Sequence, residues 1–262
     1  MTDKDRIYIR KFRWKFWLRW KYLGMMKRFA KEIHRDIERE KDTLIRCRKD
    51  MLEQKAYIDS AKSDNERKVH EIMYKQQCSF ERTANFSGFL SLTTMDLFTI
   101  LPNLYNAKNE IQRNYYARLV KMYIYELTED VTQLLAKDED RQEGKAFGLR
   151  PLVEEIGDEK LVKLHNEICG EWNDLWGRIS KDKKNFKDVR IMTVAHRDHD
   201  FLKQFESIQT VSWGQTIEDF GEFYNCYSHL TTLVQCIYNK QYAKYRHDMR
   251  GDRRVLGVSR ER

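Results

Sequence analysis

Proline and glycine are scarce in this 262-residue chain, which contains only two prolines (Pro102 and Pro151) and eleven glycines. Both residue types interrupt helices, and the rest of the chain is rich in Lys, Glu, Arg and Leu. Hydrophobic residues make up 41% of the sequence, enough for a sizeable core. The composition therefore predicts an all-α fold, a bundle of four or five helices.

Paired cysteines and long apolar runs are also missing. The five cysteines include no CxxC pair, which argues against a disulfide framework or a zinc site and for a reducing compartment. The longest weakly polar stretch, Phe89–Leu101, is too short to span a bilayer and contains Asp96. No signal peptide is visible near the start, so we expect a soluble, cytoplasmic protein.

Acidic residues are absent from the segment Arg6–Lys31. Ten Lys or Arg and no Asp or Glu lie between Arg6 and Lys31, while the whole chain has a net charge of +8. A concentrated positive charge of this kind attracts a polyanion, either a nucleic acid or an anionic membrane surface.

Tryptophans alternate with the basic residues of this N-terminal arm. An amphipathic helix with this pattern could pack its aromatic face on the body of the protein or on a second subunit. Aromatic side chains can also stack on unpaired bases while Lys and Arg neutralise phosphates, and the same composition suits membrane headgroups. For the RNA-binding hypothesis the contact residues are Arg10, Lys11, Arg13, Trp14, Lys15, Trp17, Arg19, Trp20 and Lys21.

The apolar spacing divides the chain into two predicted parts. Residues 1–80 form the arm and a charged helical extension with a thin apolar stripe, which a partner subunit could complete. Residues 81–262 form the helical bundle. Its helices are expected at about 85–101 (ending at Pro102), 106–136, from a cap at Gly157-Asp158 onward, and 212–245, with a polar loop at 137–149.

The stretch VRIMTVAHRDHD at 189–200 has the densest cluster of chemically active side chains. His196, His199 and Asp200 can share one face of a helix, but no third element supplies further ligands, so we predict no metal site. Glycine-rich phosphate loops and the signatures of serine or cysteine nucleophiles are absent as well, and no cofactor is predicted.

Arg190 and His196 suit phosphoryl chemistry, because an arginine binds phosphate oxygens and a histidine exchanges protons near neutral pH. Six residues apart, they point about 120° away from each other on a straight helix. They converge only if the helix ends near Ala195 or a second subunit adds its own copy. Alternatively Arg190, Arg197 and Asp198 form surface ion pairs and His196 caps a helix end.

Residues 106–240 resemble the HEPN superfamily of small helical proteins, in particular its AbiU-like abortive-infection branch. The resemblance rests on an Arg followed by a short spacer and a His (Arg190 to His196), on the continuation AHRD (Ala195–Asp198), and on the helices on either side. One departure is Ile191, where many catalytic members carry a polar residue, often Asn.

The resemblance implies metal-independent RNA cleavage in a dimer cleft, with His196 in proton transfer and Arg190 stabilising charge on phosphate. Arg197, Asp198 and His199 would be supporting groups. It also implies a toxin or antiphage effector that acts on tRNA or mRNA as a homodimer, with an antitoxin or inhibitor as a further expected partner. Ile191 favours the alternative, a non-catalytic HEPN-like interaction module whose basic arm binds a protein partner or a membrane.

Overall fold

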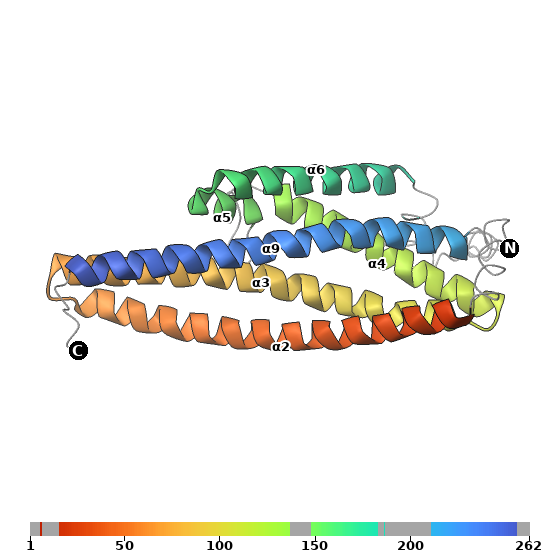
Figure 1. Ribbon diagram of the computed structural model, residues 1–262, viewed down its shortest axis with the longest axis horizontal. Helices are drawn as coiled ribbons and strands as arrows, with labels where there is room; N and C mark the ends of the chain where they lie inside the picture. The colour runs from red at the N-terminus through yellow and green to blue at the C-terminus, as the bar shows by residue number, and fades with distance from the viewer. Residues whose placement is uncertain (1–5, 7–15, 137–147, 183–185, 187–210, 256–262) are drawn as a thin grey trace, which may run out of the picture. The chain divides into compact units, whose positions relative to one another are not determined.

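The computed structural model describes residues 6, 16–136, 148–182, 186 and 211–255, with side chains described at residue 6 and between residues 24 and 245 of these ranges. All regular structure in these ranges is α-helical (Figure 1), which confirms the all-α prediction. The helices are α2 (Phe16–Ser60), α3 (Asp64–Asn106), α4 (Glu110–Ala136), α5 (Leu149–Ile156), α6 (Glu159–Lys181) and α9 (Trp213–Val255).

Four of these helices begin at a polar side chain that accepts a hydrogen bond from the first turn. The backbone N–H of Leu161 donates to Asp158 Oδ1 at 3.0 Å, so the cap predicted at Gly157-Asp158 is confirmed. Equivalent bonds start α3, α4 and α9, at Ser63, Asn109 and Ser212. Each bond satisfies an N–H that the helix itself leaves without a partner.

Proline does not end the helix in which it lies, contrary to the prediction of a helix over 85–101. Helix α3 continues through Pro102 to Asn106. The additional turn buries Leu104, which is 1% exposed and whose carbonyl accepts a hydrogen bond from Trp213 Nε1 at 3.2 Å. This burial outweighs the single backbone hydrogen bond that a proline removes.

Two further features of the helices were not expected from the sequence. Helix α5 follows the predicted loop and buries Leu149, Leu152 and Val153 before ending at Gly157, whose φ of 72° suits glycine. Residue 80, where the sequence suggested that the bundle begins, lies inside the continuous helix α3.

The helices contribute to two compact units. Unit 1 contains the described residues of Met1–Ile37, Leu90–Gln133 and Ile168–His229; unit 2 contains those of Glu38–Phe89, Leu134–Glu167 and Leu230–Arg262. Aromatic rings fill the core of unit 1. The ring of Phe98 lies 5.8 Å from Phe29 and 6.0 Å from Phe220, and Trp172 meets the ring of Phe223 edge-on at 5.8 Å.

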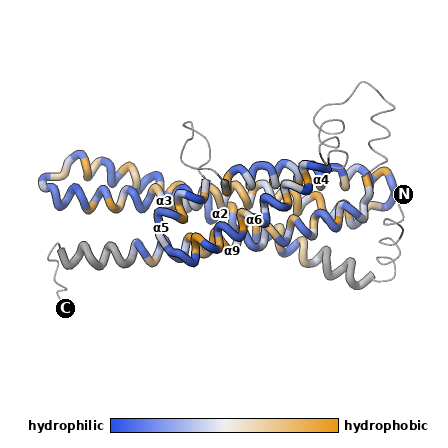
Figure 2. Tube along the Cα trace, turned by 90° about the horizontal axis from the view of Figure 1, so that it is seen from above, coloured by the Kyte–Doolittle hydropathy of each residue, from blue (hydrophilic) through white to orange (hydrophobic). Residues whose placement is uncertain are grey.

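Unit 2 contains an antiparallel hairpin made by the end of α2 and the start of α3 (Figure 1). Arg48 pairs with Glu81 at 2.9 Å, and His70 bonds Gln54 nearer the turn at 2.8 Å. Apolar residues are sparse among charged ones here, as the hydropathy colouring shows (Figure 2), and Leu52 is largely exposed. Apolar burial along this segment is therefore sparse, with Cys47 buried and Ile45 exposed.

A buried carboxylate connects the three long helices of unit 2. Glu40 of α2 is 2% exposed; its Oε2 accepts a hydrogen bond from Tyr238 Oη of α9 at 2.6 Å, and its Oε1 accepts one from Ser87 Oγ of α3 at 3.1 Å. Burial, followed by this bond to Glu40, raises the pKa of Tyr238, so its hydroxyl remains a donor. Along the same helices, Gln241 Nε2 donates to Ser79 Oγ at 2.8 Å.

Replacing Tyr238 with Phe removes one of the donors that compensate the buried charge of Glu40. We expect Tyr238→Phe to lower the free energy of unfolding by about 1.5–3 kcal/mol, the range for hydrogen bonds to charged groups. Urea denaturation followed by circular dichroism measures the change. Tyr57→Phe, at a ring that is 53% exposed, is the matched control and should cost almost nothing; equal effects would contradict the role given to Tyr238.

Histidine 165 of α6 is also buried in unit 2, at 2% exposure. Burial, chiefly, lowers the pKa of its imidazole below the usual value, although bonds to Asn166 and to the backbone of Leu135 oppose the shift. Below about pH 6.5, His165 is therefore protonated in the unfolded chain while it is still neutral in the folded protein.

This difference in proton uptake predicts that stability decreases as the pH falls from about 7.5 towards 5.5, with up to about 1.4 kcal/mol per pH unit due to His165. His165→Gln should flatten that part of the profile, as measured by urea denaturation at a series of pH values. His34→Gln, at an exposed histidine of α2, should leave the slope unchanged. If both variants retain the wild-type slope, His165 does not cause it.

Candidate functional site

The predicted catalytic motif lies outside the described residues. This holds for Arg190 and His196 and for the supporting residues Arg197, Asp198 and His199. The structure does describe the flanks of the motif: α6 before it, the single residue Phe186, and Val211 followed by α9. These flanking positions belong to unit 1.

Phe186 anchors the chain four residues before Arg190. Its side chain is 1% exposed, and the ammonium of Lys121 lies over its ring, 4.6 Å from the centroid. A cation over an aromatic face is attracted by the ring quadrupole, and the attraction strengthens when water is excluded.

A buried ion pair fixes the position of that ammonium. Lys121 Nζ of α4 donates to Asp219 Oδ2 of α9 at 3.1 Å, and both side chains are almost fully buried. The other oxygen of Asp219 accepts hydrogen bonds from Gln215 Nε2 at 3.2 Å and from Arg178 Nη1 of α6 at 3.4 Å. Arg178 also pairs with Glu222. The cluster thus joins α4, α6 and α9. Its Lys121 and Asp219 are shielded from water, whereas Arg178 and Glu222 remain partly exposed, so water screens their charges.

A second anchor lies where the chain enters α9. Val211 and Trp213 are buried, and the Trp213 indole donates to the carbonyl of Leu104 at 3.2 Å. Ser212 lies between them and accepts a hydrogen bond from the Gln215 N–H, which starts the helix. The chain is therefore tied to the core of unit 1 both before and after the predicted motif.

The predicted RNA contacts of the N-terminal arm are only partly within the described backbone. Five of them lie outside it: Arg10, Lys11, Arg13, Trp14 and Lys15. The backbone of Trp17, Arg19, Trp20 and Lys21 belongs to α2, but their side chains are outside the described ones.

The next turns of α2 are amphipathic. Met26 and Ile33 are buried, and the ring of Phe29 lies 5.9 Å from that of Tyr224, whereas Lys27 and Lys31 are exposed. In this part of the arm the apolar face packs on the body of the protein and the basic face is turned to water.

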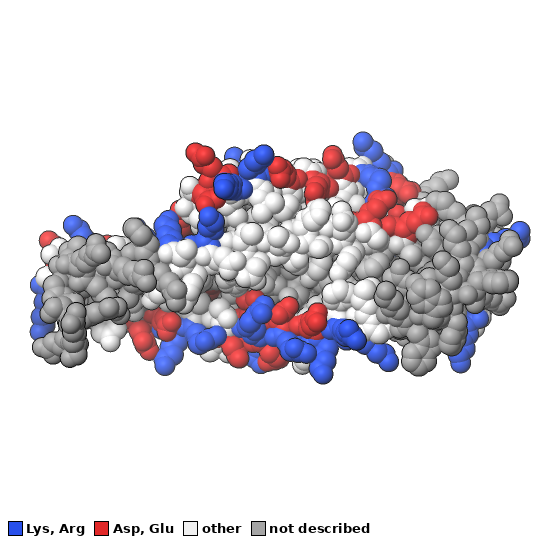
Figure 3. All heavy atoms as spheres, viewed as in Figure 1, with Lys and Arg blue, Asp and Glu red and all other residues white. Residues whose placement is uncertain are grey.

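An acidic groove of about 870 Å³ lies between α6 and α9 in unit 1. Figure 3 shows acidic side chains gathered where these helices lie in Figure 1. The charged residues that line the groove are Glu171, Asp174, Arg178, Glu218 and Glu222. Beside it, His229 Nδ1 lies 2.7 Å from Glu171 Oε2. Four carboxylates against one guanidinium make this groove unfavourable for a phosphate backbone.

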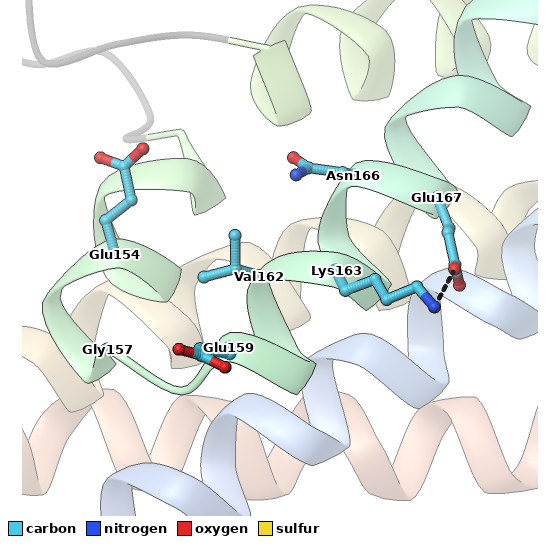
Figure 4. A pocket seen from close by; sticks show the side chains of 7 residues that line it. All are labelled: Glu154, Gly157, Glu159, Val162, Lys163, Asn166 and Glu167. Atoms are coloured by element: carbon cyan, nitrogen blue, oxygen red, sulfur yellow. Dashed lines mark ion pairs between the residues drawn. The ribbon is translucent and has the colours of Figure 1, made fainter.

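A smaller groove of about 710 Å³ lies at the corner between α5 and α6 in unit 2 (Figure 4). Lys163 turns towards Glu167, 3.8 Å away, and Glu154 pairs with Arg150 at 2.9 Å. The charges around this groove are thus largely compensated. Across the described part of the chain, no group of three or more His, Cys, Asp or Glu side chains is placed to hold a metal ion.

Sequence reasoning missed Lys121 and Asp219, although the helical spacing contained a signal. Lys121 lies four residues after Ala117 and three before Ile124, both fully buried, so it belongs to the inward face of α4. A lysine at such a position requires an acidic partner, but the spacing does not identify which of the 41 acidic residues supplies it.

No protein-family model, no curated protein and no solved structure matches this chain. Within the described ranges, no helix is both long enough and apolar enough to cross a membrane.

The buried ion pair gives a stability test. Asp219→Leu leaves the ammonium of Lys121 without a carboxylate and should cost about 3–5 kcal/mol, whereas the double variant Lys121→Met/Asp219→Leu should recover most of that loss. Urea denaturation of the single and double variants measures the difference.

The exposed pair Arg150–Glu154 is the matched control. Glu154→Leu should cost less than about 1 kcal/mol, because water already screens that pair. A double variant at Lys121 and Asp219 as unstable as Asp219→Leu alone would contradict the view that an uncompensated charge causes the loss.

Proposed function

We propose that this protein is a metal-independent, HEPN-like endoribonuclease that cleaves RNA through Arg190 and His196. The observation that carries the proposal is the position of the Arg-x5-His motif between two helices of one all-α unit. The chain is anchored to the core of that unit at Phe186 before the motif and at Trp213 after it.

The proposed reaction is an internal transfer at the RNA phosphate. The ribose 2′-OH attacks the adjacent phosphorus and loses its proton, the bond to the 5′-oxygen breaks, and that oxygen takes up a proton. The products are a 2′,3′-cyclic phosphate and a 5′-OH. His196 exchanges these protons, and the guanidinium of Arg190 stabilises the charge that develops on the phosphate oxygens. Arg197, Asp198 and His199 orient His196 or contact the backbone.

Rigid flanks support such a role, because catalytic groups act efficiently only when their positions are held within a narrow range. The cluster of Lys121, Asp219 and Arg178 joins α4, α6 and α9, and its Lys121 lies over the ring of Phe186. A motif held at both ends loses less conformational entropy when it binds RNA.

The remaining parts of the proposal concern partners. Two chains pair so that two motifs line one cleft, which brings Arg190 of one motif towards His196 of another. The target is tRNA or mRNA in the cytoplasm, the basic arm guides it to the cleft, and the activity serves as a toxin or in antiphage defence, restrained by an antitoxin.

A second candidate is a non-catalytic interaction module of the same helical type. Ile191 favours it, because an apolar residue stands directly after the motif arginine. The packing of Met26 and Ile33 also favours it, since it leaves Lys27 and Lys31 on an exposed basic face suited to an anionic membrane or an acidic protein.

His196→Ala separates these two candidates. The wild-type protein should cleave end-labelled RNA in the presence of EDTA and leave cyclic phosphate ends. His196→Ala should reduce the rate at least about 100-fold, because proton transfer by a positioned side chain contributes that much or more. Gel electrophoresis of the labelled products gives the rates. His34→Ala, at an exposed histidine of α2, is the control and should cleave like the wild type.

The opposite results have distinct meanings. Cleavage that persists in His196→Ala would refute the site assignment. Absence of cleavage by the wild type, combined with capture by anionic liposomes that is lost when the basic residues of the arm are replaced with Gln, would establish the interaction module instead.

A further inference from the structure

One face of α4 carries two exposed side chains and one half-buried side chain that neither the motif nor the arm includes. Ile111, Tyr115 and Arg118 follow each other at intervals of four and three residues, so they lie on one side of the helix. Ile111 is 82% exposed and Tyr115 is 50% exposed. Two large apolar side chains side by side in water on a single helix face suggest a binding surface.

The ring of Tyr115 is held in place. Tyr116 meets it edge-on, with ring centroids 5.2 Å apart, and the guanidinium carbon of Arg118 lies 6.0 Å from its centroid. An aromatic ring fixed by its neighbours loses little rotamer freedom when a ligand stacks on it.

Arg118 is a half-buried arginine of α4. Its Nε donates to the carbonyl of Asn114 at 3.2 Å, yet no described carboxylate pairs with it. Burial lowers the pKa of this guanidinium below its usual value, because no anion compensates the partial loss of water. By contrast, Glu81, Glu71 and Glu154 each pair with an arginine: Arg48, Arg67 and Arg150, respectively.

The local charge favours an anion. Residues 107–118 contain Lys108, Arg113 and Arg118 but only one acidic residue, Glu110, which gives a net charge of +2. The acidic groove of the same unit, between α6 and α9, has the opposite charge. A polyanion is therefore attracted to this part of α4 and repelled from that groove.

We propose that the α4 face formed by Ile111, Tyr115 and Arg118 binds single-stranded RNA, with an unpaired base stacked on Tyr115 and the adjacent phosphate held by Arg118. The choice of RNA as ligand rests on the proposed function. Base stacking is possible because every base has a flat apolar face, and the outer nitrogens of Arg118 form the planar donor set that phosphate oxygens match. Ile111 extends the apolar surface beside the ring.

Binding can be measured without cleavage in the full-length His196→Ala protein. The probe is a fluorescent oligouridine, and fluorescence anisotropy gives its dissociation constant at several salt concentrations. Adding Tyr115→Ala should weaken binding about tenfold, the loss expected for one stacked base. Tyr115→Phe should bind like its parent, because the ring remains.

The cation is tested in the same background. Arg118→Gln should weaken binding and reduce the slope of log affinity against log salt by about 0.7, the value for one phosphate contact to a single strand. Arg118→Lys should keep that slope. Tyr57→Ala, at a ring 53% exposed in unit 2, and Arg150→Gln are matched controls that should change neither quantity.

Three results would overturn the inference. The first is unchanged affinity in both Tyr115→Ala and Arg118→Gln. The second is a duplex RNA that binds as tightly as the single strand and with the same dependence on Tyr115. The third is intact RNA binding combined with loss of self-association in Tyr115→Ala, seen by sedimentation, which would make the face a protein interface. Tyr115→Phe and Arg118→Lys keep the test valid if a more drastic variant fails to fold.

The proposed function and this inference fail in different ways. A wild-type protein that binds oligouridine through Tyr115 but cuts no RNA would refute the nuclease and leave the binding face standing. A wild-type protein that cuts RNA, with affinity unaffected by Tyr115→Ala and Arg118→Gln, would refute the binding face alone.

Discussion

The buried pair of Lys121 and Asp219 is the constraint on which unit 1 depends. An ammonium and a carboxylate can remain away from water only if each stays within reach of the other, and here the two belong to α4 and α9. Arg178, which is partly exposed, adds a contact from α6 to the same carboxylate at 3.4 Å. The pair therefore restricts how three helices can be arranged and, through the ring of Phe186, where the chain leaves α6 towards the predicted motif.

Unit 2 meets a similar requirement with two neutral donors and one charged neighbour, Arg39, whose Nη2 lies 3.6 Å from Glu40 Oε1. Tyr238 and Ser87 compensate the charge of Glu40, and hydroxyl and amide groups of Ser79, Thr83 and Gln241 bond one another along the same helices. Both units thus combine an apolar core with a small number of buried polar contacts between helices. A buried polar group without a partner costs free energy, so these contacts are satisfied in only one arrangement of the helices. Leu and Ile side chains, by contrast, can pack in several arrangements.

The sequence predicted the helices well and the contacts between them poorly. Helical spacing identified the buried stripe of α6 from Leu161 to Ile179, and Asp158 marked its start, because both signals are local. Pro102 misled the prediction, since the burial of Leu104 is a tertiary effect. The partner of Lys121 lies 98 positions away in the chain, and the exposed ring of Tyr115 has the same helical spacing as a core residue.

The polar contacts of Glu40 also have a consequence for how the chain folds. Long helices with sparse apolar stripes can pair in several alignments that differ by one turn and bury similar areas. A shift of α9 by one turn would carry the Tyr238 hydroxyl about 5.4 Å away from Glu40 and leave a carboxylate buried with one donor fewer. Intermediates of unit 2 in which the helices are misaligned therefore have a higher free energy. A few polar atoms thus favour the correct alignment over the others that bury similar apolar areas.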